Sequence, residues 1–173
     1  YGGAGDDEIF GQLGADTLYG DSLYGDSGHD VLFGDFGSIT RVIDQAGNPL
    51  LNPNGSWLKK FLLVSPETGS GDSMYGGAGD DTMFGGAGND TMDGGTGDDY
   101  MEGNIGADTM YGRAGEDDMI GGSSDITVPN QASRSDSGEV MMDGGDGHDV
   151  LIGDNGRISR RIDPATNQFV RAT

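Results

Sequence analysis

The 173-residue chain has no cysteine, which excludes disulfide bonds and thiolate metal sites. Basic residues are scarce, with 9 Lys and Arg against 30 Asp and Glu, so the formal net charge is -21. No stretch approaches the roughly 18 apolar residues of a membrane-spanning helix, and phosphate backbones and anionic membranes would repel the chain. We therefore expect neither nucleic-acid binding nor membrane insertion. Hydrophobic residues make up only 33% of the chain, which excludes a large apolar core.

Glycine and aspartate are the abundant residues. The chain has 35 Gly, and 25 of its 30 acidic residues are Asp. Asp is a poor helix former, and Asp with Gly is typical of turns. High charge with a small core is typical of disorder, unless a bound cation completes the structure.

A nine-residue repeat runs through residues 76–120. Its first three copies read Gly-Gly-Ala-Gly-Asp-Asp-Thr-Met-Phe, Gly-Gly-Ala-Gly-Asn-Asp-Thr-Met-Asp and Gly-Gly-Thr-Gly-Asp-Asp-Tyr-Met-Glu. In all five copies position six is Asp and position eight is Met. Further copies lie at 2–10, 11–19, 25–33 and 144–152, and shortened copies at 21–24, 72–75 and 140–143.

This run resembles the RTX (hemolysin-type) calcium-binding nonapeptide, Gly-Gly-x-Gly-x-Asp-x-U-x with U a large aliphatic residue, which forms a parallel β-helix. The resemblance implies an all-β fold: a right-handed parallel β-roll, a two-sheet β-helix with 18 residues per turn, with hairpin and loop insertions. Each turn then holds two strands and two loops, so that Met83, Met101 and Met119 stack against Met92 and Met110.

Elementary chemistry agrees with the resemblance. Glycines at positions one, two and four allow positive φ, so that carbonyls can turn toward one point. Asp at position six adds a carboxylate, and position eight is the one apolar side chain of a short strand that points inward. One Met in nine residues cannot offset the entropy of ordering them, so we predict that the roll is largely unfolded without calcium.

The resemblance also implies which residues bind the metal. Each ion would lie between two loops on one side of the roll, pairing Asp81 with Asp99, Asp99 with Asp117 and Asp90 with Asp108. The expected ligands are position-six carboxylates and glycine-loop carbonyls: Asp7, Asp16, Asp30, Asp81, Asp90, Asp99, Asp108, Asp117, Asp149, Gly77, Gly79, Gly86, Gly88, Gly95, Gly97, Gly106 and Gly115. A site made only of oxygen ligands suits Ca²⁺, and several ions are expected.

The repeats and their interruptions predict six segments. We expect β-roll repeats over 1–34, a hairpin-like insertion over 35–66, the main roll with five in-register nonapeptides over 67–122, an excursion loop over 123–139, a further roll repeat over 140–156 and the start of a second hairpin insertion over 157–173. In the first insertion, 39–44 predicts a strand, 45–48 a turn and 49–51 a returning strand. The hydrophobic stretch 57–64, with the only tryptophan, either covers apolar edges of its own roll or contacts a neighbouring copy or a ligand.

A longer recurrence is also visible. Residues 25–44 recur as 144–163, an offset of 119 residues, so the chain reads as a window of a longer tandem array. Eight of the nine basic residues lie outside the repeats, where they compensate the acidic roll.

Two motifs that imitate catalytic sites are explained by the repeat. Gly-Asp-Ser-Leu occurs at 20–23 and Gly-Asp-Ser-Gly at 25–28, where Gly-Asp-Ser is turn chemistry, and a nucleophilic serine needs a histidine base held by a third group. The only histidines, His29 and His148, both occupy position five, which faces outward. We therefore expect no enzymatic activity in these residues.

These features predict a calcium-binding structural module of a large extracellular bacterial RTX protein, acting as a stalk, adhesin or fibre repeat. The resemblance implies type I secretion, with folding where calcium is abundant, and neighbouring tandem repeats as partners, with other copies reached through the Trp57 segment. The alternative is the calcium-folding and secretion region of an RTX exoenzyme or toxin whose catalytic domain lies outside this chain. The recurrence at an offset of 119 residues favours the structural module.

Overall fold

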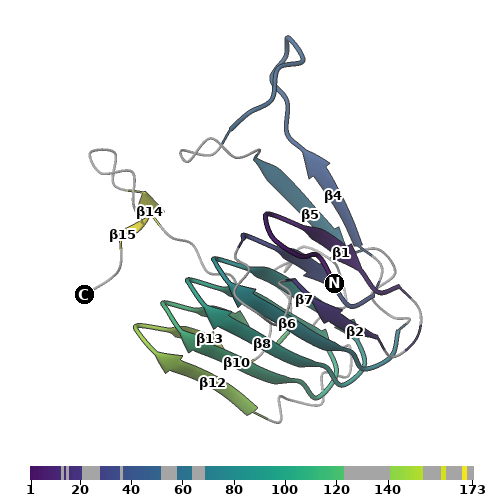
Figure 1. Ribbon diagram of the computed structural model, residues 1–173, viewed down its shortest axis with the longest axis vertical. Coiled ribbons are helices and arrows are strands. Elements are labelled where there is room, and N and C mark those ends of the chain that lie inside the picture. Colours follow the sequence, from purple (N-terminus) through teal and green to yellow (C-terminus); the bar gives the residue numbers. More distant parts are fainter. Residues whose placement is uncertain are drawn as a thin grey trace.

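The computed structural model describes residues 1–12, 14, 16–20, 28–35, 37–51, 58–63, 69–122, 141–153, 161–162 and 169–170. All the regular secondary structure of these residues is β-strand. Figure 1 shows most of them stacked in a column, with β1 and β2 at one end and β12 and β13 at the other, and the β4–β5 hairpin projecting near the N-terminal end.

The column consists of two parallel sheets. The first sheet has six strands, in the order β1 (Glu8–Phe10), β3 (Val31–Phe33), β7 (Thr82–Ala87), β9 (Tyr100–Ile105), β11 (Asp118–Ile120) and β13 (Val150–Ile152). The second has five, in the order β12 (Met141–Asp146), β10 (Thr109–Ala114), β8 (Thr91–Thr96), β6 (Ser73–Ala78) and β2 (Thr17–Tyr19). Successive strands of the central repeat alternate between the sheets, which confirms the predicted β-roll.

The repeat sets the register within each sheet. Met83 pairs with Met101 and Met101 with Met119 in the first sheet, while Met92 lies between Met74 and Met110 in the second. The full-length strands have six residues, longer than expected, because pairing continues through the glycine positions.

The core between the two sheets is the row of position-eight side chains from each sheet. It contains Leu18, Leu32, Met74, Met83, Met92, Met101, Met110 and Met119, and the six methionines are fully buried. Ile9 and Met142 pack against its two ends. This narrow core agrees with the low hydrophobic content of the chain.

The first insertion contains an antiparallel hairpin. Its strands are β4 (Gly37–Arg41) and β5 (Lys59–Leu63), and Asp44 accepts amide hydrogen bonds from Ala46 and Asn48 at the intervening turn. The ladder partner of β4 is therefore β5. The segment predicted to return, 49–51, lies beyond the end of β4, where Ile43 bridges Pro49 and the Leu50 amide donates a hydrogen bond to the Val42 carbonyl at 2.8 Å. Proline has no amide hydrogen and cannot extend a ladder.

The hairpin packs on the outer face of the first sheet. The Phe61 ring lies 6.4 Å from that of Phe33 and 5.6 Å from that of Phe84. At the same end, Glu8 pairs with Arg41 at 3.2 Å and with Lys59 at 3.0 Å. This favours the interpretation that the hydrophobic insertion covers its own roll, although Trp57 itself lies outside the described residues.

Two remaining segments were predicted to interrupt the roll. The excursion loop at 123–139 lies outside the described residues. Near the C-terminal end, β14 (Arg161–Ile162) and β15 (Phe169–Val170) pair antiparallel. In the described part of the chain, no helix has the length and hydrophobicity needed to cross a bilayer.

Candidate metal centre

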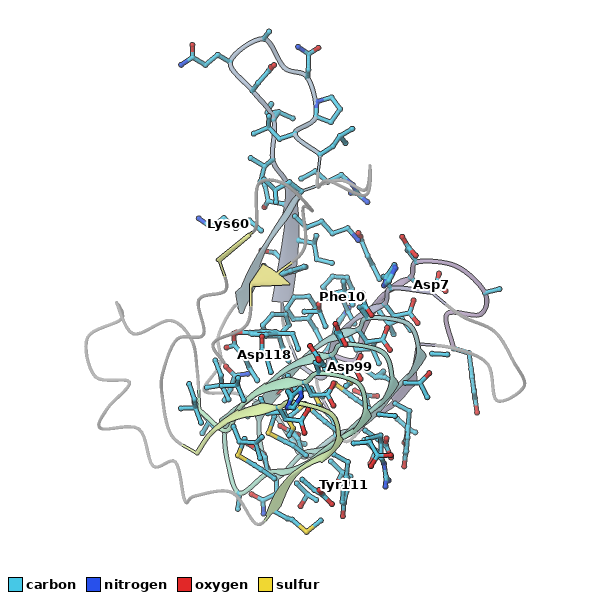
Figure 2. The ribbon with its side chains drawn as sticks, turned by 90° about the vertical axis from the view of Figure 1, so that its left-hand side faces the viewer. Asp7, Phe10, Lys60, Asp99, Tyr111 and Asp118 are labelled. Carbon is cyan, nitrogen blue, oxygen red and sulfur yellow. The ribbon has the colours of Figure 1, made fainter. Side chains whose placement is uncertain are left out.

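The position-six aspartates form two rows, each directly before the strands of one sheet. Along each row, the backbone amide of one Asp donates a hydrogen bond to Oδ1 of the Asp on the next rung, at 2.7–3.0 Å. The first row contains Asp7, Asp30, Asp81, Asp99, Asp117 and Asp149, and the second contains Asp16, Asp72, Asp90 and Asp108. The three predicted Asp pairs are therefore neighbours on successive rungs. Figure 2 shows Asp99 in the roll, with Phe10 on the hairpin side and Tyr111 on the opposite side.

In six of these aspartates the second carboxylate oxygen, Oδ2, is buried without a protein hydrogen bond. Asp90 and Asp99 are only 1% and 2% exposed, respectively. Oδ2 accepts no hydrogen bond in either residue, and the same holds for Asp7, Asp16, Asp72 and Asp117. An unpartnered carboxylate oxygen is costly to bury, and such groups normally pair with a charge or bind a metal.

The first glycine of each repeat provides space beside this oxygen. A Cβ on Gly85 would collide with Oδ2 of Asp90 and would lie 2.6 Å from the carbonyl oxygen of Gly103 on the next rung. A carboxylate oxygen and a carbonyl oxygen thus approach the space that a side chain would fill. The same arrangement recurs at other repeats: Gly20, Gly34, Gly76, Gly94, Gly103 and Gly112.

The eight predicted glycine ligands share one backbone conformation. Their φ angles lie between 109° and 151°, a range that side-chain-bearing residues rarely adopt: Gly77, Gly79, Gly86, Gly88, Gly95, Gly97, Gly106 and Gly115. Whether their carbonyls and the position-six carboxylates bind the ion stays a prediction.

Burial and mutual repulsion raise the pKa of four carboxyl groups in these rows. Burial, followed by the neighbouring carboxylates, raises the pKa of Asp90 and Asp99 to about 8. The same causes raise the pKa of Asp72 and Asp117 to about 6. At neutral pH the rows are therefore unfavourable when charged, and a bound cation would remove this penalty.

The position-five residues form a further row, which is separate from the two aspartate rows and is exposed. The amide of Asp98 donates to Oδ1 of Asp80 at 3.0 Å, and that of Glu116 donates to Oδ1 of Asp98 at 2.9 Å. His29 takes the place of such an Asp, because its Nδ1 accepts from the amide of Asp80 at 2.9 Å. His29 thus has a backbone-supporting contact of the same kind as Asp80 and Asp98.

The donor set fits a hard cation bound largely by backbone. Among the described residues, no group of three His, Cys, Asp or Glu side chains is placed to hold a metal by itself. Carbonyl oxygens would have to complete the coordination, and Ca²⁺ accepts 6–8 oxygen ligands of this mixed kind.

Two buried carboxylates were missed by the sequence prediction. Asp72 belongs to a shortened copy, but it lies 18 residues before Asp90, as Met74 lies before Met92, and that spacing could have identified it. Asp35 carries no such signal, because an insertion separates it from the rest of its repeat. The structure also changes the start of one repeat. Gly20 occupies the first-glycine place beside Asp30, whereas Gly25, the predicted first residue of that repeat, lies outside the described residues.

Comparison with protein families agrees with this geometry. The model of the RTX calcium-binding nonapeptide repeat (4 copies) matches residues 1–22, 21–38, 68–101, 93–125 and 136–157, which together are more than half of the chain. The chain belongs to the RTX calcium-binding nonapeptide repeat family. RTX repeats bind several calcium ions, so calcium is the cation that this chain binds. No curated protein and no solved structure matched this RTX chain.

Proposed function

We propose that this chain is a calcium-folded structural module of a secreted bacterial protein. Calcium ions bind between successive rungs, held by the position-six carboxylates and by carbonyls of the glycine loops. The roll folds when these ions bind outside the cell, and it then acts as a rigid repeat of a stalk, adhesin or fibre. The module has no catalytic role of its own.

One observation carries the proposal: the rows of buried aspartates whose Oδ2 atoms accept no hydrogen bond, as at Asp90 and Asp99. The methionine core is too narrow to offset both the ordering of the glycine loops and the burial of these charges. A cation between the rungs stabilises the folded chain and leaves the unfolded chain unaffected, so folding and binding become one equilibrium.

Circular dichroism tests this coupling. We expect little strand signal in EDTA and a cooperative rise as calcium approaches about 1 mM, the range of extracellular calcium modules. Magnesium at the same concentration should restore much less strand signal, because Mg²⁺ dehydrates reluctantly and seldom occupies protein cages. A strand signal equally strong in EDTA would contradict the proposal.

The recurrence of residues 25–44 at 144–163 supports a tandem architecture. A roll that serves only the secretion and folding of an enzyme has no need of a repeated unit with its own insertion. The sequence of the full-length gene distinguishes the two roles. Many further copies of the unit would support the stalk or adhesin, and a single roll beside one catalytic domain would support the exoenzyme.

A further inference from the structure

The first long insertion leaves the roll directly after a first-position glycine. Gly34 lies against Oδ2 of Asp72, and a Cβ on it would be 2.5 Å from the carbonyl oxygen of Gly85. Gly34 therefore takes the place that Gly85 takes beside Asp90. The repeat that begins at Gly34 is completed only at Asp72, after the inserted hairpin.

The second position of this divided repeat is a carboxylate, Asp35. Where no insertion follows, the described second positions have no acidic side chain and share a positive φ: Gly3, Gln12, Gly77, Gly86, Gly95, Asn104, Arg113 and Gly145. Asp35 is therefore a departure from the repeat at the point where the chain leaves the roll.

The Asp35 side chain is buried, with 1% of its surface exposed. Its Oδ2 accepts a hydrogen bond from the amide of Ala87 at 2.7 Å, which fixes the orientation of the carboxylate. Its Oδ1 is buried and accepts no hydrogen bond. One oxygen of Asp35 thus supports the backbone, and the other has no protein hydrogen-bond partner.

Asp35 and Asp72 flank the same pair of rungs. Asp72 Oδ2 lies against Gly34, the residue before Asp35, while the Asp35 carboxylate lies against Gly86, the residue after Gly85. We propose that Asp35 is an additional carboxylate ligand of the cation bound at Asp72, and that this cation fixes the root of the inserted hairpin.

The electrostatics of the site support this placement. Burial, with the charges of Asp35 and Asp16, raises the pKa of Asp72 to about 6. Burial also raises the pKa of Asp35. Two buried carboxylates close enough for one to raise the pKa of the other form a site that favours a divalent cation.

The sequence repeats this feature at other departures from the period. Gly20-Asp21 precedes the additional residues before Asp30, and Gly153-Asp154 is the counterpart of Gly34-Asp35 at an offset of 119 residues. The departure at Gly121-Gly122 has no second-position Asp, and there Val140 stands directly before Met141, where a position-six Asp is expected. At the two insertions whose following position-six Asp lies in this sequence, Gly20-Asp21 before Asp30 and Gly34-Asp35 before Asp72, the second position is acidic.

The extra ligand has a consequence for the order of folding. Calcium sites with more charged ligands bind more tightly, so the Asp35–Asp72 site should fill first as calcium rises. Strand β4 begins at Gly37, two residues after Asp35, so filling this site orders the hairpin root. This inference rests on the proposed function, because it assumes calcium between the rungs.

The test compares Asp35→Asn with Asp146→Asn in the full chain. Asp35→Asn keeps an oxygen acceptor for the Ala87 amide and removes only the charge, while Asp146→Asn removes one charge from an exposed position of the roll. Trp57 fluorescence reports the insertion, because it is the only tryptophan, and circular dichroism reports the roll. Titration calorimetry counts the bound calcium ions.

We expect Asp35→Asn to raise the calcium midpoint of Trp57 fluorescence roughly tenfold or more, with loss of one tight ion. Asp146→Asn should stay within about twofold of the wild type. Equal midpoints for the two variants would overturn the inference and leave the proposed function intact. An Asp35→Asn variant whose calcium midpoint equals that of the wild type would assign Asp35 to the Ala87 hydrogen bond alone and would also overturn it. A wild type that ignores calcium would overturn the proposed function itself.

Discussion

The methionine rows and the aspartate rows run side by side along the roll and are buried to the same degree. Met92 and Met101 are 0% exposed, and Asp90 and Asp99 are 1% and 2% exposed. Each methionine packs against methionines of the next rungs, so its row is complete in the protein alone. Asp90 and Asp99 each accept a hydrogen bond from a row neighbour at Oδ1 only, and each faces a like charge on the next rung. The comparison shows that the methionine rows are packed within the protein, whereas these carboxylates leave one buried oxygen without a hydrogen bond.

Substituting one residue in each row gives the largest expected contrast. Met101→Ala should destabilise the roll by about 2–5 kcal/mol with calcium bound, because it opens a cavity, and it should not improve the calcium-free form. Asp99→Asn should weaken calcium binding by roughly tenfold or more, because it removes a charged ligand, yet raise the residual strand signal in EDTA at pH 8.

Urea unfolding in saturating calcium and circular dichroism in EDTA measure these two effects. The diagnostic result for Asp99→Asn is destabilisation in saturating calcium together with a higher strand signal in EDTA. If Asp99→Asn lowers the strand signal in EDTA as well, the aspartate row is a structural element like the methionine row, and the comparison fails.

Acid should partly replace calcium in the aspartate rows. The pKa of Asp90 and Asp99 is about 8, raised first by burial, and that of Asp72 is about 6. The calcium-free folded form therefore holds protons that the unfolded chain releases near pH 4, so its stability falls as the pH rises through 6 to 8. In EDTA, strand signal should increase from pH 8 to pH 5, whereas the calcium midpoint should move to higher calcium over the same change because protons compete for the ligands. A calcium midpoint that does not change with pH would argue against carboxylate ligands.

Blocking the space beside one aspartate should have a smaller effect. Gly85→Ala places a methyl group against Oδ2 of Asp90 and the Gly103 carbonyl, and overpacking of this kind costs about 1–3 kcal/mol. It should also raise the calcium midpoint. Gly47→Ala is the control, since its Cβ meets nothing within 4 Å and its φ of 85° brings only local strain. Calorimetric titration of both variants separates the effects, and equal calcium affinities would show that the space beside Asp90 holds no ion.

The smallest effect is expected one residue before a buried aspartate. Asp98 is exposed and its Oδ1 accepts the Glu116 amide, a bond that an asparagine can also accept. Asp98→Asn should change the calcium midpoint by about twofold at most, because exposed charges contribute little. The same titration as for Asp99→Asn measures it. Equal losses for both variants would mean that net charge, and not the buried oxygen, controls binding.

The repeat predicted most of the roll because each nonapeptide specifies its own conformation. Glycines with positive φ, one inward methionine and one loop aspartate recur every nine residues, so the strands β6 to β11 and the pairs Asp81–Asp99 and Asp90–Asp108 could be assigned without coordinates. Prediction was weaker where insertions divide a repeat. The segment 49–51 returns beside Val42 and Ile43 as predicted, but the ladder partner of β4 is the more distant β5, because strand pairing depends on contacts between residues that are distant in the chain.

The sequence by itself determined the rung: its period, its apolar position, its carboxylate and the charge of -21 that calcium must offset. These are local properties, and the repetition of one unit leaves a single register in which all its copies agree. Only the tertiary structure decided which residues complete the divided rungs, joining Gly34 and Asp35 to Asp72 and packing Phe61 against Phe33 and Phe84. These contacts join residues that are separated in the chain by a segment without the repeat, so only the stacking of the folded rungs brings them together.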